Sequence, residues 1–141
     1  MPLWRLFYHV VWATKGRHPL LRPDHQELVG RTIHAACNEQ GVVLHAVGLM
    51  PDHIHVCASI PPSLALGEAV GRWKGATSFL LNREGGLGDS TFAWQREYAV
   101  HSFGEKALPD VVAYVTDQPN RHRLGKLWEP LESLSDNGRN G

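Results

Sequence analysis

The chain has 141 residues, 43% of them hydrophobic, and its 14 Lys and Arg residues balance 14 Asp and Glu residues. This size and hydrophobic content suit a single compact domain, and two cysteines, Cys37 and Cys57, are too few for a disulfide framework. No charged segment followed by an apolar stretch opens the chain, and no run approaches the roughly 18 apolar residues of a membrane span, so we expect a cytoplasmic protein that has no contact with a membrane.

The first half of the chain has the pattern of a strand, a helix and a second strand. The first strand covers residues 4–13. The helix begins at Asp24, because Asp24 and Glu27 have the spacing of a capping box, and it ends at Gly41. The second strand follows over residues 42–49 and leads into a tight turn.

The strand after the turn at Met50-Pro51-Asp52 carries two histidines in alternation. Side chains alternate between the two faces of a strand, so His53 and His55 lie on the same face. The opposite row is apolar, and we expect it to face the core: Ile54, Val56, Ala58 and Ile60. Two imidazoles on one face are half of a metal site, although the same pattern also occurs in strands with a purely structural role.

A helix, a strand and a last helix complete the pattern. Pro61 and Pro62 break the sheet, and Ser63 is placed to cap a helix. The apolar stripe of this helix has helical spacing: Leu66, Val70, Trp73 and Leu80. A glycine-rich loop at residues 85–88 precedes a strand over residues 92–103.

The resulting β-α-β-β-α-β-α order predicts an α+β fold, the ferredoxin-like split β-α-β sandwich. Its antiparallel sheet has two helices on one face and leaves the other face open. The third strand is central in this arrangement. His53 and His55 therefore lie in the middle of the open face, where a C-terminal helix can cover them.

The last helix covers residues 106–118, with Pro109 in its first turn. Its apolar stripe consists of Leu108, Val111, Val112 and Val115. At about 100° per residue, Tyr114 lies roughly 110° from the centre of this stripe, and Gln118 follows on the same side. We therefore expect both side chains to lie outside the core and Tyr114→Phe to leave the fold intact. A half-buried tyrosine beside an ordinary helix-end glutamine is the alternative.

Together, the His-bulky-His strand and the Tyr-x-x-x-Gln helix resemble the HUH-type single-tyrosine transposases of small bacterial and archaeal insertion sequences. This is the insertion sequence 200/605 family, with its REP-associated relatives. Further segments agree with the family in the same order: residues 8–21, 48–56, 70–75 and 94–104. The similarity extends over about residues 5–123. We expect one HUH transposase domain over residues 1–132 and a disordered tail over residues 133–141.

The resemblance implies a metal-dependent enzyme that cleaves and rejoins single-stranded DNA at hairpin-marked element ends through a 5′-phosphotyrosine intermediate. Tyr114, on the C-terminal helix, would be the nucleophile. Two imidazoles and an amide oxygen, from His53, His55 and Gln118, would make an open three-ligand site for Mg²⁺ or Mn²⁺ acting as a Lewis acid. The resemblance also implies a homodimer with sheets joined edge to edge, in which the tyrosine helix can serve the partner's histidine pair.

The zero net charge fits DNA binding poorly, because DNA-binding domains commonly have a basic excess. Basic residues nevertheless gather in three segments, which are candidate DNA contacts: Lys15, Arg17 and Arg22; Arg72, Lys74 and Arg83; Arg121 and Arg123. If these contacts exist, a hairpin with a single-stranded flank binds better than blunt duplex, and salt weakens the binding. The alternative is that the three segments are ordinary solvated surfaces.

Other residues near the histidine strand are expected to be structural. Asp52 fixes the turn, and Cys57 is a small buried thiol. Three histidines lie in predicted strands: His9, His45 and His101. Three aromatic residues are expected in the core, although an exposed one could stack on a base: Trp73, Trp94 and Tyr98.

Two alternative functions stay open at this point. One is a domesticated relative that binds or nicks hairpins without mobilising an element. The other is an unrelated small metal-dependent hydrolase, in which Tyr114 has no part in the chemistry. Pro119 departs from an ideal ligand helix, because it ends the helix directly after Gln118.

Overall fold

The computed structural model describes residues 3–84 and 91–118. The elements follow in the predicted order: β1 (Phe7–Ala13), α1 (His25–Gln40), β2 (Val43–Met50), β3 (His53–Ser59), α2 (Leu66–Glu84), β4 (Ala99–Phe103) and α3 (Leu108–Thr116). Two short 3₁₀ turns add to them: η1 (Lys15–Arg17) and η2 (Glu105–Ala107). The glycine-rich loop at 85–88 and the tail at 133–141 lie outside the described residues.

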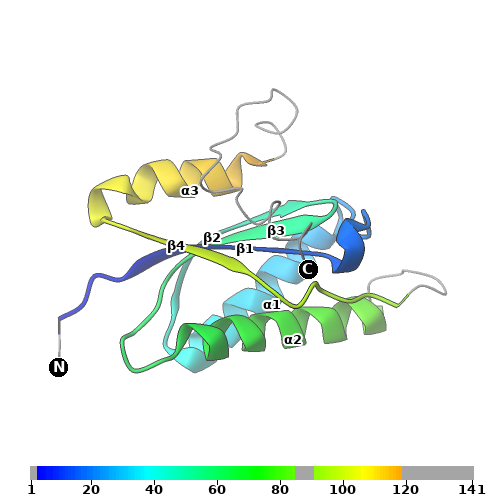
Figure 1. Ribbon diagram of the computed structural model, residues 1–141, viewed down its shortest axis with the longest axis horizontal. Coiled ribbons are helices and arrows are strands. Elements are labelled where there is room, and N and C mark those ends of the chain that lie inside the picture. The colour runs from blue at the N-terminus through cyan, green and yellow to red at the C-terminus, as the bar shows by residue number, and fades with distance from the viewer. Residues whose placement is uncertain (1–2, 85–90, 119–141) are drawn as a thin grey trace.

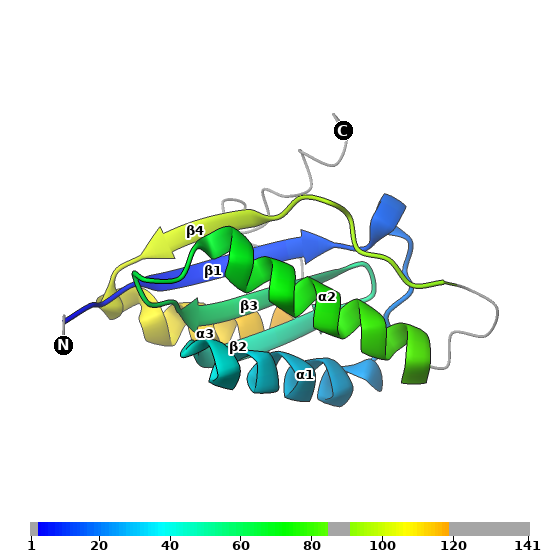
Figure 2. The ribbon, with the colours of Figure 1, turned by 90° about the horizontal axis from the view of Figure 1, so that it is seen from below.

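The strands form one antiparallel sheet in the order β2-β3-β1-β4. Helices α1 and α2 cover one face of the sheet, and α3 lies on the other (Figure 1). The view in Figure 2 shows α1 and α2 side by side in front of the strands, with α3 behind them. This is the predicted α+β sandwich, and β3 is a central strand as expected.

The main core lies between the sheet and the α1/α2 layer. The predicted apolar row of β3 belongs to this core and is almost fully buried: Ile54, Val56, Ala58 and Ile60. Trp12 of β1 stacks on Trp73 of α2 with ring centroids 6.3 Å apart, and Trp94 meets Trp12 edge-on at 5.7 Å. Burying one large apolar side chain contributes about 1.5–3 kcal/mol, so this layer supplies most of the stability.

The predicted boundaries of α1 are half right. Gly41 ends the helix in the left-handed region at φ 71°, and its N–H donates to the carbonyl of Cys37, as a glycine cap requires. The capping box is wrong: in the described part of the chain the Asp24 side chain makes no cap hydrogen bond. Its carboxylate instead accepts a hydrogen bond from Arg22 Nε at 3.0 Å.

Helix α2 begins at Leu66 and not at the predicted cap Ser63. Its buried positions also differ from the predicted stripe, because Leu81 is buried whereas Leu80 is partly exposed. A search for large apolar side chains overlooks the small Ala69 and the polar Thr77, which are both buried. The whole buried set of α2 is Ala69, Val70, Trp73, Thr77 and Leu81.

Two strands, β1 and β4, are shorter than predicted. β1 begins at Phe7, and β4 covers only Ala99–Phe103. Before β4, the chain leaves the ladder because its carbonyls have another partner: Lys74 Nζ donates to Gln95 O at 2.6 Å and to Arg96 O at 2.9 Å. This stretch pairs with the segment at the end of β1 through an isolated bridge between Thr14 and Trp94.

Candidate active site

The predicted site residues come together between the sheet and α3. His53 and His55 of β3 face this helix, with their ring centroids 5.0 Å apart. The Tyr114 ring lies 6.0 Å from the His55 ring and nearly perpendicular to it. His55, Tyr114 and Gln118 have no exposed surface, and His53 is 4% exposed. The histidine face is therefore covered, and the tyrosine that covers it belongs to the same chain.

The expected orientation of α3 is partly wrong. Val111 and Val115 are buried as predicted, but the buried residues follow i, i+3, i+4, i+7 spacing and include two polar ones: Val111, Tyr114, Val115 and Gln118. Leu108 and Val112, the other two residues of the predicted stripe, are only partly buried. A stripe chosen by hydrophobicity assumes an apolar surface beneath the helix, whereas this sheet face presents histidines and accepts tyrosine and glutamine. Tyr114 is thus part of the buried packing and not an exposed residue.

Gly48 of β2 allows α3 to lie this close. A Cβ at Gly48 would overlap the carbonyl oxygen of Val115 and lie 3.3 Å from Gln118 Cγ. Gly48 is also the cross-strand partner of His55. The close approach therefore brings the end of α3, and with it Gln118, next to the histidine pair. Helix α3 ends at Thr116, so Gln118 follows the helix rather than closing it, and Pro119 lies outside the described residues.

Asp52 holds the outer edge of His53. Its Oδ1 lies 2.7 Å from His53 Nδ1, and its Oδ2 accepts a hydrogen bond from Arg17 Nε at 3.1 Å. Burial opposes ionisation of this carboxyl, but the hydrogen bonds and charges of His53 and Arg17 outweigh it and lower the pKa of Asp52 to about 2. The backbone carbonyl of Asp52 also accepts a hydrogen bond from the Thr14 N–H at 2.9 Å, which ties the β2–β3 turn to the end of β1.

His9 of β1 contacts the second histidine. Its Nε2 and His55 Nδ1 share a hydrogen bond of 2.8 Å, and both residues are fully buried. Sequence reasoning treated His9 and Asp52 as structural and missed these contacts. The only signal was periodicity, which puts His9 on one face of its strand but cannot say which strand lies beside it.

The residues fit a divalent metal ion. In the ranges 3–84 and 91–118, no group of three or more His, Cys, Asp or Glu side chains is arranged to hold one. Among the described residues, the amide of Gln118 is the third candidate ligand that the sequence predicted beside His53 and His55. Its Nε2 donates to the Tyr114 carbonyl at 3.0 Å, while its buried Oε1 has no hydrogen-bond partner among the described residues. The amide oxygen, with water or phosphate in the remaining positions, suits manganese or magnesium, and the two imidazoles would also accept zinc or nickel.

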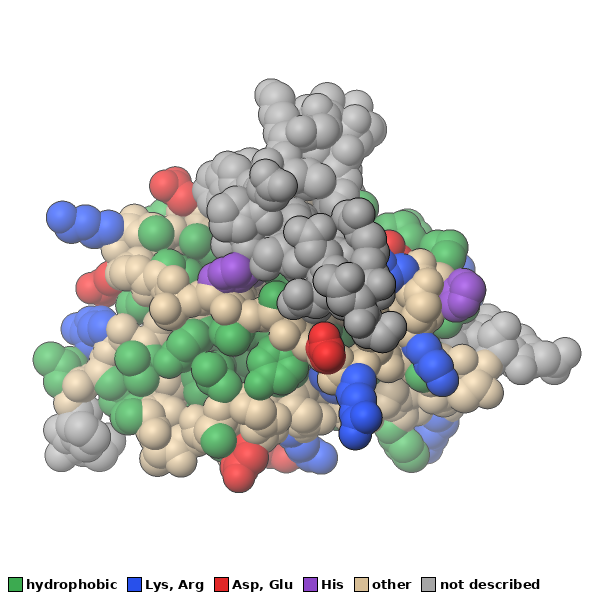
Figure 3. Space-filling view, in the orientation of Figure 1, with side chains coloured by type: hydrophobic (Ala, Val, Ile, Leu, Met, Phe, Trp, Pro, Cys, Tyr) green, Lys and Arg blue, Asp and Glu red, His purple; other side chains and the backbone are tan. Residues whose placement is uncertain are grey.

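The candidate DNA contacts are mostly engaged with other protein groups. Arg22 pairs with Asp24, Arg72 pairs with Glu39 at 2.9 Å, and Lys74 bridges backbone carbonyls. Acidic and basic side chains are interspersed on the face seen in Figure 3. Arg83 lies over the Phe79 ring at 6.0 Å, and its helix α2 is on the opposite side of the sheet from Tyr114. Arg121 and Arg123 lie outside the described residues.

Lys15 and Arg17 are the candidate contacts nearest to the site. They form η1, directly after β1, whose last residue Ala13 pairs with His53. Lys15 is exposed, and Arg17 carries the ion pair to Asp52. A basic segment therefore lies at the end of the sheet where His53 begins β3.

The remaining structural expectations hold. His45 Nε2 bonds to Ser59 Oγ at 2.7 Å. Cys57 is fully buried against α3, and burial raises the pKa of its thiol to about 12. Trp73 is buried, and Trp94 and Tyr98 pack against the main core.

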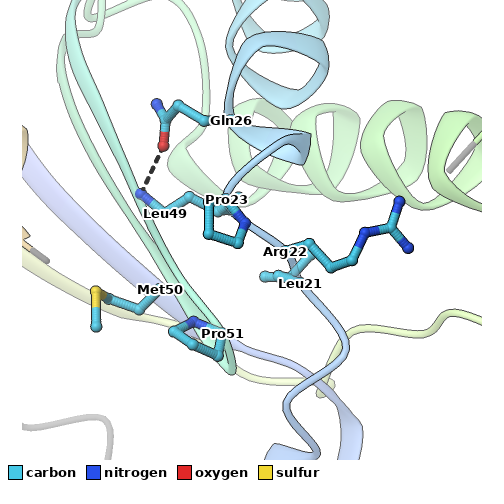
Figure 4. A pocket seen from close by; sticks show the side chains of 7 residues that line it. All are labelled: Leu21, Arg22, Pro23, Gln26, Leu49, Met50 and Pro51. Carbon is cyan, nitrogen blue, oxygen red and sulfur yellow. Dashed lines mark hydrogen bonds between the residues drawn. The ribbon is translucent and has the colours of Figure 1, made fainter.

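A separate hollow of about 390 Å³ lies at the outer edge of β2, between the β2–β3 turn and the start of α1 (Figure 4). Its walls are mainly apolar and include Leu21, Leu49 and Pro51. Gln26 points from α1 to the strand edge, where its Oε1 accepts from the Leu49 N–H at 3.0 Å and its Nε2 donates to Val47 O at 3.1 Å. The glutamine amide thus occupies backbone groups that a neighbouring strand would otherwise use.

Two solved structures described as transposases share this fold. A Deinococcus radiodurans protein assigned as a transposase superposes with a TM-score of 0.66 at 24% identity, covering 81% of this chain and 91% of that one. A REP-associated tyrosine transposase bound to a REP hairpin superposes with a TM-score of 0.63 at 16% identity, covering 90% of this chain and 76% of that one. The molecule therefore has the fold of the tyrosine transposases.

Sequence comparison narrows this class to one family. Residues 2–118 match the model of the IS200-like transposases. The transposase of insertion sequence IS200 from Salmonella typhimurium is 27% identical over 129 residues, covering 87% of this chain and 83% of that protein. The ISDra2 transposase TnpA of Deinococcus radiodurans is 22% identical over 125 residues, covering 84% and 88%. The chain belongs to the IS200-like transposase family, which indicates DNA-cleaving and strand-transferring activity.

No helix within residues 3–84 and 91–118 has the length and apolar character needed to cross a membrane.

Proposed function

We propose that this transposase cleaves and rejoins single-stranded DNA through Tyr114. The observation that carries the proposal is the buried cluster in which the Tyr114 ring lies against His55. Gln118 is buried with it, and its Oε1 has no hydrogen-bond partner among the described residues. The phenol oxygen attacks the scissile phosphorus, the bond from phosphorus to the 3′-oxygen of the upstream strand breaks, and the proton released by the phenol is balanced by the proton that the 3′-oxygen takes up from solvent as it leaves as a hydroxyl. The 5′-phosphate stays on the tyrosine, so rejoining needs no external energy source.

His53, His55 and Gln118 hold the metal ion in this proposal, with Mg²⁺ or Mn²⁺ as the ion. A bound divalent ion supplies Lewis-acid stabilisation of charge on the phosphate oxygens. The protein residues orient the reacting groups. Burial of Tyr114 on α3 fixes its ring beside the histidine pair, and the low exposure of all four side chains excludes water that would compete with DNA. The site has to open before a phosphate reaches the hydroxyl, because Tyr114 has no exposed surface.

The proposed substrate is a DNA hairpin with a single-stranded flank. Support comes from the REP-associated relative, which was solved with a REP hairpin. The exposed η1 segment beside His53 offers a cation for the flank. A homodimer remains part of the proposal, but the Tyr114–His55 contact within one chain means that a single chain can assemble the cluster without the partner's α3.

The decisive experiment replaces Tyr114 by Phe and incubates the protein with labelled single-stranded hairpin DNA and Mn²⁺. We expect the covalent protein–DNA adduct and the cleavage to disappear together, because no neighbouring group can form the phosphotyrosyl bond. The hydroxyl belongs to a buried residue, so its loss can cost about 1 kcal/mol of stability, and a melting curve accompanies the assay. Denaturing electrophoresis with protease treatment reads the adduct.

Tyr98→Phe is the matched control, since this tyrosine packs against the other side of the sheet and should leave the adduct unchanged. Metal-dependent cleavage that persists in Tyr114→Phe, with free ends and no adduct, would point to a metal-dependent hydrolase. Hairpin binding without any cleavage by the unaltered protein would point to a domesticated binder, the alternative that the zero net charge keeps open.

A further inference from the structure

The two histidines of the site each have a protein partner at the same ring nitrogen. In each imidazole the Nδ1 edge already has a protein partner within the described structure. His53 Nδ1 lies 2.7 Å from Asp52 Oδ1, and His55 Nδ1 lies 2.8 Å from His9 Nε2. The Nε2 atom is then the nitrogen of each ring that remains on the side away from these partners.

We propose that Asp52 and His9 are positioning residues, which hold the Nδ1 edges of His53 and His55 so that both rings present Nε2 lone pairs to one metal ion beside Gln118. This inference rests on the proposed function, because it concerns the same metal site. It adds two residues and assigns each a different task.

Asp52 determines the tautomer of His53. A carboxylate only accepts hydrogen bonds, so in the neutral imidazole, the form that binds metal, His53 Nδ1 carries the proton and donates it, and the lone pair is on Nε2. Asp52 is itself held in place. Arg17 Nε donates to the second carboxylate oxygen at 3.1 Å, and the Thr14 N–H donates to the backbone carbonyl of Asp52 at 2.9 Å. His53 is thus held in a ligand-ready state before metal arrives.

His9 holds His55 in a different way, because a neutral imidazole can donate or accept. If His9 Nε2 accepts, His55 keeps its proton on Nδ1 and offers a lone pair on Nε2. If His9 Nε2 donates, the proton of His55 moves to Nε2, and the ring cannot bind metal through that atom. The metal therefore selects the accepting tautomer of His9.

The sheet register makes this contact possible. His9 is the cross-strand partner of Cys57, two residues beyond His55 on the same face of β3. A diagonal pair of this kind is within reach of long side chains, and the two rings are nearly parallel with centroids 5.0 Å apart. His9 is fully buried, so the hydrogen bond does not compete with solvent.

The test measures binding of Mn²⁺ alone by isothermal titration calorimetry, with no DNA and no activity readout. Asp52→Asn and His9→Leu should each weaken Mn²⁺ binding about 10- to 100-fold, the usual effect of losing an outer-shell partner. His45→Gln is the control, because His45 bonds to Ser59 and should leave the affinity unchanged. Affinities of both variants within twofold of the unaltered protein would overturn the proposal.

Two further measurements keep the result unambiguous. His53→Ala should abolish Mn²⁺ binding; if it does so while Asp52→Asn and His9→Leu bind normally, only the positioning roles fail. If the unaltered protein does not bind Mn²⁺, or if His53→Ala binds it as tightly as the unaltered protein does, both the metal site and the positioning roles are overturned. Should a variant not fold, long-range ¹H–¹⁵N NMR of the unaltered, metal-free protein reads the tautomer directly. We expect Nδ1–H for His53, and an Nε2–H tautomer there would overturn the role of Asp52.

Discussion

Cys57 lies on the same row of β3 as His53 and His55 but has a different surrounding. The histidines meet hydrogen-bonding partners, whereas the thiol packs against Val111 and Val115 of α3. A thiol needs to ionise to bind metal or attack an electrophile, and burial opposes the charged form. His55 is therefore surrounded by hydrogen-bonding groups, whereas Cys57, two residues further along the same row, is surrounded by apolar side chains.

Both thiols should consequently resist modification in the folded protein. Burial raises the pKa values of Cys37 and Cys57 to about 12, so at about pH 8 only on the order of one thiol in ten thousand is ionised. We expect a disulfide reagent such as Ellman's to label neither cysteine in buffer and both in denaturant. Rapid labelling of either thiol in the native state would contradict the burial described here.

At the scale of elements, the packing of α3 on β2 decides whether Tyr114 and Gln118 reach the histidines. Gly48→Ala places a methyl group against the carbonyl of Val115, so α3 has to shift. We expect a loss of about 1–3 kcal/mol in the free energy of unfolding, the usual cost of overpacking, together with weaker adduct formation. Urea denaturation and the covalent trapping assay measure the two effects.

Gly75→Ala is the matched control for this substitution. A Cβ at Gly75 of α2 would meet no described atom within 4 Å beyond its neighbours and its own helix backbone. Alanine is the better helix former, so this variant should gain roughly 0.5–1 kcal/mol and keep full adduct formation. Equal stability changes for the two variants would show that α3 does not rest on Gly48.

At the scale of the whole molecule, the sheet separates two tasks. The face under α1 and α2 is apolar and supplies the core, while the face under α3 carries the histidines. The charges follow no such division, because acidic side chains neutralise many of the basic ones in local pairs. The net charge of the chain is zero, although its family acts on DNA.

DNA affinity should therefore depend on where a cation lies and not on how many there are. Lys15→Gln, at the sheet end beside His53, should weaken hairpin binding and reduce the slope of log affinity against log salt by about 0.7, the value for one contact to a single strand. Arg72→Gln, on the far side of the sheet and paired with Glu39, should change neither quantity. Fluorescence anisotropy over a salt series separates the two variants, and an equal effect of both would argue against DNA binding along η1.

Local periodicity in the sequence was sufficient to determine the order of the elements and the common face of His53 and His55. Each of these depends on residues within a few positions of one another, where strand and helix repeats apply. The Gly41 cap and the apolar row from Ile54 to Ile60 belong to the same group. Local patterns were less reliable at element ends, where Asp24 bonds to Arg22 and Lys74 draws the chain out of β4.

Only the tertiary structure decided which face of α3 is buried and which residues surround the histidines. Hydrophobicity placed Tyr114 outside the packing, but the surface beneath the helix is polar, so the tyrosine and Gln118 are buried on it. The His9–His55 bond depends on the register between β1 and β3, and the Arg17–Asp52 pair joins residues 35 positions apart. Contacts of this kind follow from how strands pair and how a helix approaches a sheet, which the period of a single strand or helix does not contain.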